Sequence, residues 1–143
     1  MSSIPLHYID LRAFCYVTED ENRVEDALRH FLPEEFEIDR AVSEGHFGDR
    51  IVVLSARVER ADEMRTVLDT LGELADDEFE RIQRELDERV NENCAFFLTI
   101  DKQAAFTGDV RLGDGITFRS KVEAYPAKKP AAIENVEDVL EEL

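Results

Sequence analysis

The fold is decided by the stretch Cys94-Ala95-Phe96-Phe97-Leu98-Thr99-Ile100 and by the segments that follow it, as far as Tyr125. The seven residues form the longest strand-like tract of the chain. After Asp101-Lys102-Gln103-Ala104-Ala105-Phe106-Thr107-Gly108, Val110-Arg111-Leu112 leads through Gly113-Asp114-Gly115 into a last apolar alternation. These patterns predict a strand over 94–100 and a hairpin that pairs 110–112 with a strand over 116–124.

The same stretch begins the basic region of a very acidic chain. The 143 residues carry 34 Asp and Glu against 17 Lys and Arg, a net charge of −17. Between residues 102 and 129, however, the basic residues outnumber the acidic ones by six to three. The six are Lys102, Arg111, Arg119, Lys121, Lys128 and Lys129. A polyanion would be attracted to this region before any other.

The acidic composition itself has two interpretations. An excess of carboxylates with 4 Lys against 13 Arg is typical of a protein from the high-salt cytoplasm of a halophile, where repulsion between like charges is screened. The alternative is an acidic surface for a protein partner. Either way, the net charge argues against nonspecific binding of nucleic acid, and it leaves a local site open.

Length and composition predict a single domain over residues 1–143 with a sizeable core. No apolar run approaches the roughly 20 residues of a membrane span, and the N-terminus has no signal-peptide pattern. Cys15 and Cys94 each lie in an apolar strand pattern without a Cys or His at ligand spacing. We expect two buried free thiols in a reducing cytoplasm.

Residues 7–17 alternate as a strand with two different faces. Ile9, Leu11 and Ala13 lie on one face, and the other face combines a base with three aromatic rings. That second set consists of Tyr8, Asp10, Arg12, Phe14 and Tyr16. It would suit a stacking platform for unpaired bases. The alternative is a face covered by another element or by a partner subunit, which leaves a homodimer open.

The remaining elements are predicted from the periodicity of the apolar residues and from helix-capping residues. Thr18 and Glu21 form a capping-box pattern that predicts a helix over 20–31, ended by Pro33. Alternation predicts strands over 36–43 and 51–58, and helical spacing predicts helices over 61–74 and 77–91, the second capped by Asp76. Residues 126–143 read as a connector and a short acidic C-terminal helix. Because hairpins outnumber crossovers, we predict an α+β fold: a two-layer sandwich with a mostly antiparallel sheet and helices packed on one face.

Enzyme signatures are absent from the sequence. There is no phosphate loop, dinucleotide fingerprint or nucleophile elbow, and His7, His30 and His46 are too far apart in sequence to suggest a catalytic pair. No spacing of Cys, His or carboxylates suggests a metal site. We therefore predict a protein that is not an enzyme and has neither cofactor nor metal.

The candidate RNA contacts lie in the basic region. Lys102 and Gln103 stand where the chain leaves the sheet, and they offer a cation for phosphate and an amide for a base edge or ribose. The alternative is a self-contained corner in which Asp101 caps the next turn and pairs with Lys102 or an arginine. Arg119 and Lys121 share one strand face roughly 7 Å apart, and Arg111 on the predicted partner strand would join them.

Four motifs in this order resemble an archaeal family whose members are described as RNA-binding proteins or predicted exosome subunits. They are Thr18-Glu19-Asp20-Glu21, Leu32-Pro33-Glu34-Glu35, Gly45-His46-Phe47-Gly48 and Asp101-Lys102-Gln103-Ala104-Ala105 with Gly108. The resemblance covers residues from about 8 to 122. It implies a fold like that of the ribosomal protein that binds 5S rRNA. The family's turn usually continues with Asn-Pro, where this chain has Asp49-Arg50.

The resemblance implies a cytoplasmic, non-catalytic RNA-binding or RNA-processing accessory protein that takes single-stranded or looped RNA. It adds His46 and Arg50, in and after the glycine-rich turn, to the contacts expected from Lys102, Gln103, Arg111, Arg119 and Lys121. The alternative is an adaptor subunit that docks on an RNA-processing assembly with little direct RNA contact. The −17 net charge favours that alternative.

Overall fold

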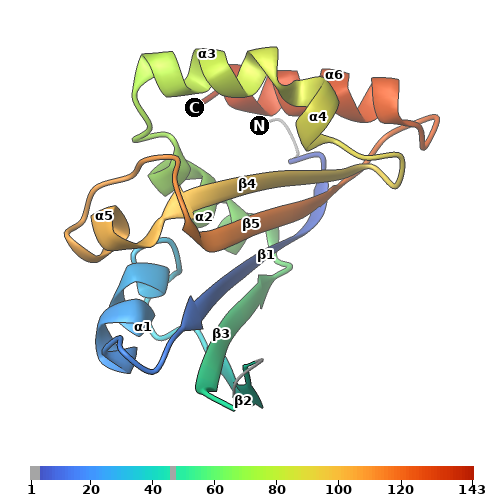
Figure 1. Ribbon diagram of the computed structural model, residues 1–143. Helices are drawn as coiled ribbons and strands as arrows, with labels where there is room; N and C mark the ends of the chain where they lie inside the picture. The colour runs from blue at the N-terminus through green and yellow to red at the C-terminus, as the bar shows by residue number, and fades with distance from the viewer. Residues whose placement is uncertain (1–3, 46–47) are drawn as a thin grey trace.

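The computed structural model describes residues 4–45 and 48–143, and it confirms the α+β fold class (Figure 1). Five antiparallel strands form one sheet in the order β2-β3-β1-β5-β4. The strands are β1 (Leu6–Cys15), β2 (Asp39–Glu44), β3 (Arg50–Val58), β4 (Ala95–Asp101) and β5 (Gly115–Val122). The helices within the described residues are α1 (Glu21–Arg29), α2 (Ala61–Leu71), α3 (Asp76–Arg84), α4 (Leu86–Arg89), α5 (Lys102–Phe106) and α6 (Lys129–Glu141).

Strand β1 is the centre of the sheet because its alternation buries one complete face. Leu11 lies between Ala56 of β3 and Phe118 of β5, and all three side chains are buried. Burying a large apolar side chain stabilises the fold by roughly 1.5–3 kcal/mol. The helices contribute their apolar stripes to the same core, for example Val24 and Leu28 of α1.

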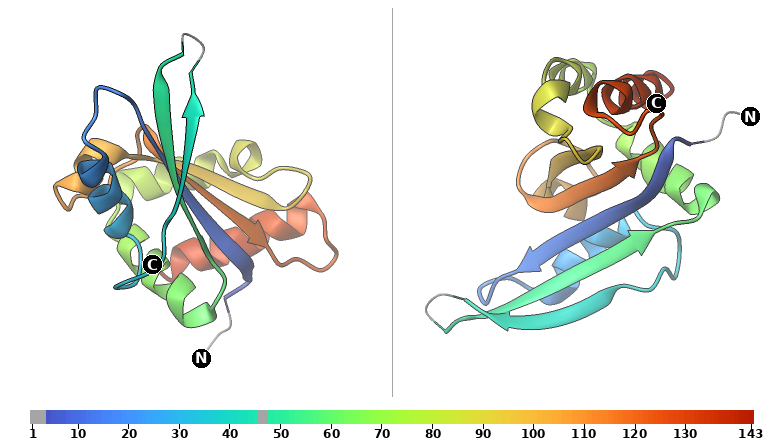
Figure 2. Two further views of the ribbon diagram at one scale, coloured as in Figure 1. Left: turned by 90° about the horizontal axis from the view of Figure 1, so that it is seen from below. Right: turned by 90° about the vertical axis from the view of Figure 1, so that its right-hand side faces the viewer.

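None of the helices in the described part of the chain covers the opposite side of the sheet, as the right-hand view in Figure 2 shows for β1, β3 and β5. Cross-strand partners share a face, so the pairing registers define which side chains lie there. We call this surface the open sheet face. Its central members are Tyr8, Asp10, Arg12, Phe14, Ser55, Arg57, Phe97, Thr99, Thr117, Arg119 and Lys121.

The predicted hairpin between 110–112 and 116–124 is wrong. Strand β5 pairs with β4, and residues 102–106 form helix α5, while Leu112 makes only an isolated bridge to Ile100. The reason is a helix cap, since the Asp101 carboxylate accepts a hydrogen bond from the Ala104 amide at 2.9 Å. Gly115, at φ +114°, then lets β5 start against this corner, where a Cβ would lie 2.5 Å from Lys102 Cβ.

Two predicted helix caps are also wrong. Asp20, not Thr18, caps α1, because its carboxylate accepts from the Asn22 amide at 2.9 Å. Asp76 is the first residue of α3 and not its cap. The helix predicted over 77–91 is interrupted at Glu85, which divides it into α3 and α4.

Strand β2 and the C-terminus differ from the predictions in extent. Strand β2 is an edge strand whose six residues are all exposed, so it contributes to no solvent-shielded face. The connector after β5 is shorter than predicted, since α6 has 13 residues and includes Pro130 in its first turn. Both cysteines are buried free thiols, as predicted. None of the helices among the described residues is long and apolar enough to cross a membrane.

Candidate nucleic-acid interface

The centre of the open sheet face is an arginine stacked on a tyrosine. Arg57 of β3 is the cross-strand partner of Asp10, and its guanidinium donates to both carboxylate oxygens at 2.8 and 3.0 Å. This fork holds the Arg57 guanidinium 4.0 Å from the centroid of the Tyr8 ring. The hydrogen bond to Asp10 raises the pKa of Arg57 further. The result is a fixed, charged, planar group on an aromatic support.

A second arginine lies over an aromatic ring two strands away. Arg119 of β5 pairs across the sheet with Asp10 on one side and with Phe97 of β4 on the other. Its guanidinium lies 5.8 Å from the centroid of the Phe97 ring, and the residue is exposed. Two guanidinium–ring stacks therefore flank Asp10 across four neighbouring strands.

Two further cations complete the positive charge of the open sheet face. Lys121 pairs across the sheet with Tyr8, and its ammonium donates to the Asn93 carbonyl. Arg12 lies between Thr117 and Ser55, is exposed, and forms no ion pair with another described residue.

Little negative charge opposes these four cations. The acids on the same side of the strands are Asp10, Asp39 and Asp101. Asp10 is neutralised by Arg57, and Asp101 caps α5. Within the strands four cations thus face three carboxylates, and Glu123 follows at the end of β5, so this side is far less negative than expected from a net charge of −17. The carboxylates that dominate the composition lie elsewhere, for example in the first turns of α2 and α3.

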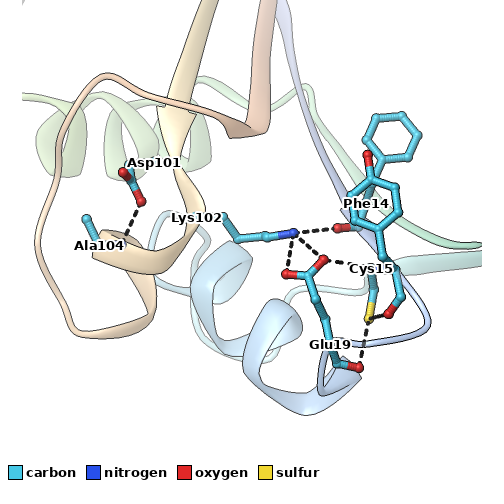
Figure 3. A network of polar contacts seen from close by, with 7 residues as sticks. Phe14, Cys15, Glu19, Asp101, Lys102 and Ala104 are labelled. Carbon is cyan, nitrogen blue, oxygen red and sulfur yellow. Dashed lines mark hydrogen bonds and ion pairs between the residues drawn. The ribbon is translucent and has the colours of Figure 1, made fainter.

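Lys102 is buried, and its ammonium is fully engaged (Figure 3). It donates to the Phe14 carbonyl at 2.8 Å and pairs with the two Glu19 carboxylate oxygens at 2.8 and 2.7 Å. Burial raises the pKa of Glu19, but the hydrogen bonds from Lys102 and from the Tyr16 amide, together with the Lys102 charge, outweigh it and lower that pKa overall. Asp101 caps the turn that follows it, as expected for a self-contained corner. Lys102, however, pairs with Glu19 and not with Asp101.

The other expected contacts do not join Arg119 and Lys121 on the open sheet face. Gln103 is exposed on α5, beside a 410 Å³ cavity where Arg23 stacks on the Phe106 ring at 4.8 Å. Arg111 lies in the loop after α5 and pairs with Asp109 at 2.8 Å. Arg50 starts β3 on the opposite side of the strand from Arg57, and His46 lies outside the described residues.

The basic region of the sequence is therefore not one patch in space. Lys102 is buried, and Lys129 at the start of α6 pairs with Asp87 of α4 at 3.5 Å. The cluster that does form takes Arg119 and Lys121 from this region and adds Arg12 and Arg57 from β1 and β3. Among the described residues, no group of three or more His, Cys, Asp or Glu side chains is placed to hold a metal ion.

Comparison with known proteins gives a family and several relatives. A family model described as RNA binding matches residues 8–122. The RNA-binding protein PAB1135 of Pyrococcus abyssi is 34% identical over 144 residues, which cover 94% of each chain.

Solved structures of similar proteins share the fold. The protein AF2318 from Archaeoglobus fulgidus superimposes with a TM-score of 0.84 at 28% identity, covering 94% of this chain and 99% of that one. Mth689, a DUF54 protein from Methanothermobacter thermautotrophicus, has a TM-score of 0.78 at 37% identity and covers 94% and 98%.

Proposed function

This chain belongs to the RNA-binding family, and we propose that it holds single-stranded or looped RNA on its open sheet face. The observation that carries the proposal is the pair of guanidinium–ring stacks, Arg57 on Tyr8 and Arg119 on Phe97, on the one side of the sheet without helices. An arginine plane fixed from below presents its outer surface to a base, because bases stack on guanidinium groups as well as on rings.

The cations around these stacks supply phosphate contacts. Arg12 and Lys121 lie at the borders of the stacked pair, so a strand of RNA that stacks on Arg57 or Arg119 places its backbone within their reach. A duplex does not fit this arrangement, since its bases are already stacked and only splayed bases expose their faces. Single-stranded RNA is therefore the expected ligand, and the small number of phosphate contacts implies a modest salt dependence, of about 0.7 per contact in the slope of log affinity against log salt.

We propose a non-catalytic role, as an accessory protein of RNA processing in a high-salt archaeal cytoplasm. The open sheet face offers planar cations, aromatic rings and hydroxyl groups, which bind RNA by stacking and by contacts to phosphate. Lys102 supports the face from behind, because it holds the carbonyl of Phe14 at the end of β1.

The acidic helix side favours a second role for the same protein. The first turns of α2 and α3 carry Asp62, Glu63, Asp76, Asp77 and Glu78. Such a surface is complementary to a basic protein partner, so an adaptor that docks on an RNA-processing assembly is the competing function.

A salt titration separates the two roles. Replacing Arg119 and Lys121 together with alanine is expected to weaken binding of a labelled single-stranded RNA and to flatten the slope of log affinity against log salt by about 0.7 per lost contact. The matched control is Arg65→Ala with Arg84→Ala, two exposed cations on α2 and α3, which is expected to leave affinity and slope unchanged. Equal affinities and slopes for wild type and the sheet variant would remove β5 as the site. No RNA binding by the wild type at any salt would favour the adaptor.

A further inference from the structure

A 350 Å³ pocket lies at the border of the open sheet face, where three segments meet. They are the start of β1 with His7, residues 92–94 before β4, and the segment 121–127 that leaves β5. The last two run side by side at the right of Figure 1, joined by a hydrogen bond from the Val122 amide to the Cys94 carbonyl at 2.8 Å. We call this cavity the Tyr125 pocket.

The Tyr125 pocket continues the proposed RNA surface without a break. Lys121 lines the pocket and is also the cross-strand partner of Tyr8, the ring on which Arg57 stacks. An RNA strand that leaves the Arg57 stack past Tyr8 therefore meets a residue of the pocket lining on the next strand, since partners across a sheet lie roughly 5 Å apart.

The side chains of the pocket suit a base better than a phosphate. Glu92 and Glu123 bring two carboxylates to the lining, and these repel an anion. His7, whose Nδ1 lies 3.4 Å from a Glu123 carboxylate oxygen, and Lys121 bring donors. A neutral base edge with both acceptors and an amino group matches this mixture, because carboxylates accept hydrogen bonds from exocyclic amino groups.

Tyr125 provides the stacking surface. Its side chain is 97% exposed at the edge of the pocket, the most exposed large apolar residue among those described. A ring in this position covers a base that enters the pocket, and a base–aromatic stack makes a substantial contribution to affinity. The volume also fits, since pockets for small ligands begin at roughly 300 Å³.

We infer that the Tyr125 pocket takes one unstacked base that carries an exocyclic amino group, from the RNA that lies on the open sheet face. The inference rests on the proposed function and adds selectivity to it. Cytosine, adenine and guanine have such an amino group, and uracil does not. A cytidine oligomer is therefore expected to bind more tightly than a uridine oligomer of the same length.

The chain contains no tryptophan, so the fluorescence of a single introduced tryptophan reports on its own position without background. In a Tyr125→Trp variant the single indole is expected to be quenched when a cytidine oligomer binds, while anisotropy of the labelled RNA reports binding anywhere on the protein. The matched control is Val42→Trp, at a β2 residue that is 53% exposed and lies outside both the pocket and the open sheet face. Its indole is expected to stay unquenched.

Two substitutions test the selectivity. Tyr125→Ala is expected to lower affinity for the cytidine oligomer about tenfold and to change uridine binding little. Replacing Glu92 and Glu123 with glutamine is expected to abolish the preference for cytidine over uridine. RNA binding by anisotropy without quenching at position 125, or equal cytidine and uridine affinities in the wild type, would overturn the pocket and leave the open sheet face intact. Absence of RNA binding by anisotropy would overturn both.

Discussion

Replacing Lys102 with methionine is expected to lower the free energy of unfolding by about 3 kcal/mol. The change keeps the apolar stem and removes the ammonium. It leaves the Glu19 carboxylate with the Tyr16 amide but without a cation, and it removes the Lys102 donor from the Phe14 carbonyl. The Lys102 and Glu19 side chains are only 9% and 20% exposed, so water does not replace the lost contacts fully. Urea unfolding of wild type and variant at neutral pH measures the difference.

A second substitution shows that the loss comes from the broken pair. Replacing Glu19 as well, with glutamine, removes the uncompensated charge, so the double variant is expected to be more stable than Lys102→Met alone. A Lys102→Met variant within about 0.5 kcal/mol of wild type would contradict the structural role of Lys102. Such a result would indicate that the Lys102 ammonium lies at the surface, where the sequence suggested that it contacts phosphate.

The pH dependence of the same variant has a definite sign. In the wild type the lowered pKa of Glu19 means that the pair stabilises the fold above the ordinary carboxyl range and loses this effect as pH falls through the folded-state pKa. In Lys102→Met the hydrogen bond and the charge of Lys102 no longer lower the pKa of Glu19, so Glu19 takes up its proton at a higher pH than in the wild type. The stability difference between the two proteins is therefore expected to shrink between pH 7 and the carboxyl range near pH 4.

Replacing Arg57 and Arg119 with lysine is expected to weaken RNA binding by about 30-fold or more while the salt slope stays unchanged. The two lysines keep both positive charges but lack the planar guanidinium groups on which bases stack. Each base stacked on such a plane contributes roughly 1–3 kcal/mol, and two lost stacks at the lower bound give this factor. Phosphate contacts set the slope of log affinity against log salt, and these remain.

The matched control is lysine at two arginines of the helix side, Arg65→Lys with Arg84→Lys, which is expected to bind RNA as the wild type does. Circular dichroism and urea unfolding verify that the sheet variant is folded, since Arg57→Lys also loses the fork to Asp10. Wild-type affinity in the Arg57→Lys, Arg119→Lys variant would show that the arginines act only through charge and would remove the stacking platform.

Local patterns predicted the elements of the sheet well. The alternation of Ile9, Leu11 and Ala13 depends only on neighbouring residues, so β1 and its buried face followed from the sequence. The failed predictions involve competition between local signals. The glycines at 113 and 115 suggested a tight hairpin. Instead, Asp101 caps helix α5, and a loop connects this helix to β5.

The candidate site was only half predictable, because it is assembled by strand pairing. The pairing of Arg57 with Asp10 joins residues 47 positions apart, and no local sequence pattern predicts it. The aromatic side of β1 was recognised from sequence as a stacking platform, yet Phe97 and Arg57 enter it only through the register of β4 and β3. Conversely, the basic residues 102–129 are near one another in sequence and are separated in space.

The most direct test of the open sheet face is crosslinking of a 4-thiouridine oligomer to the wild-type protein, followed by mass spectrometry of the linked peptides. We expect crosslinks in peptides of β1, β4 and β5 that contain Tyr8, Phe97 or Arg119, and none in α2, α3 or α6. Crosslinks confined to the helix side would contradict this expectation.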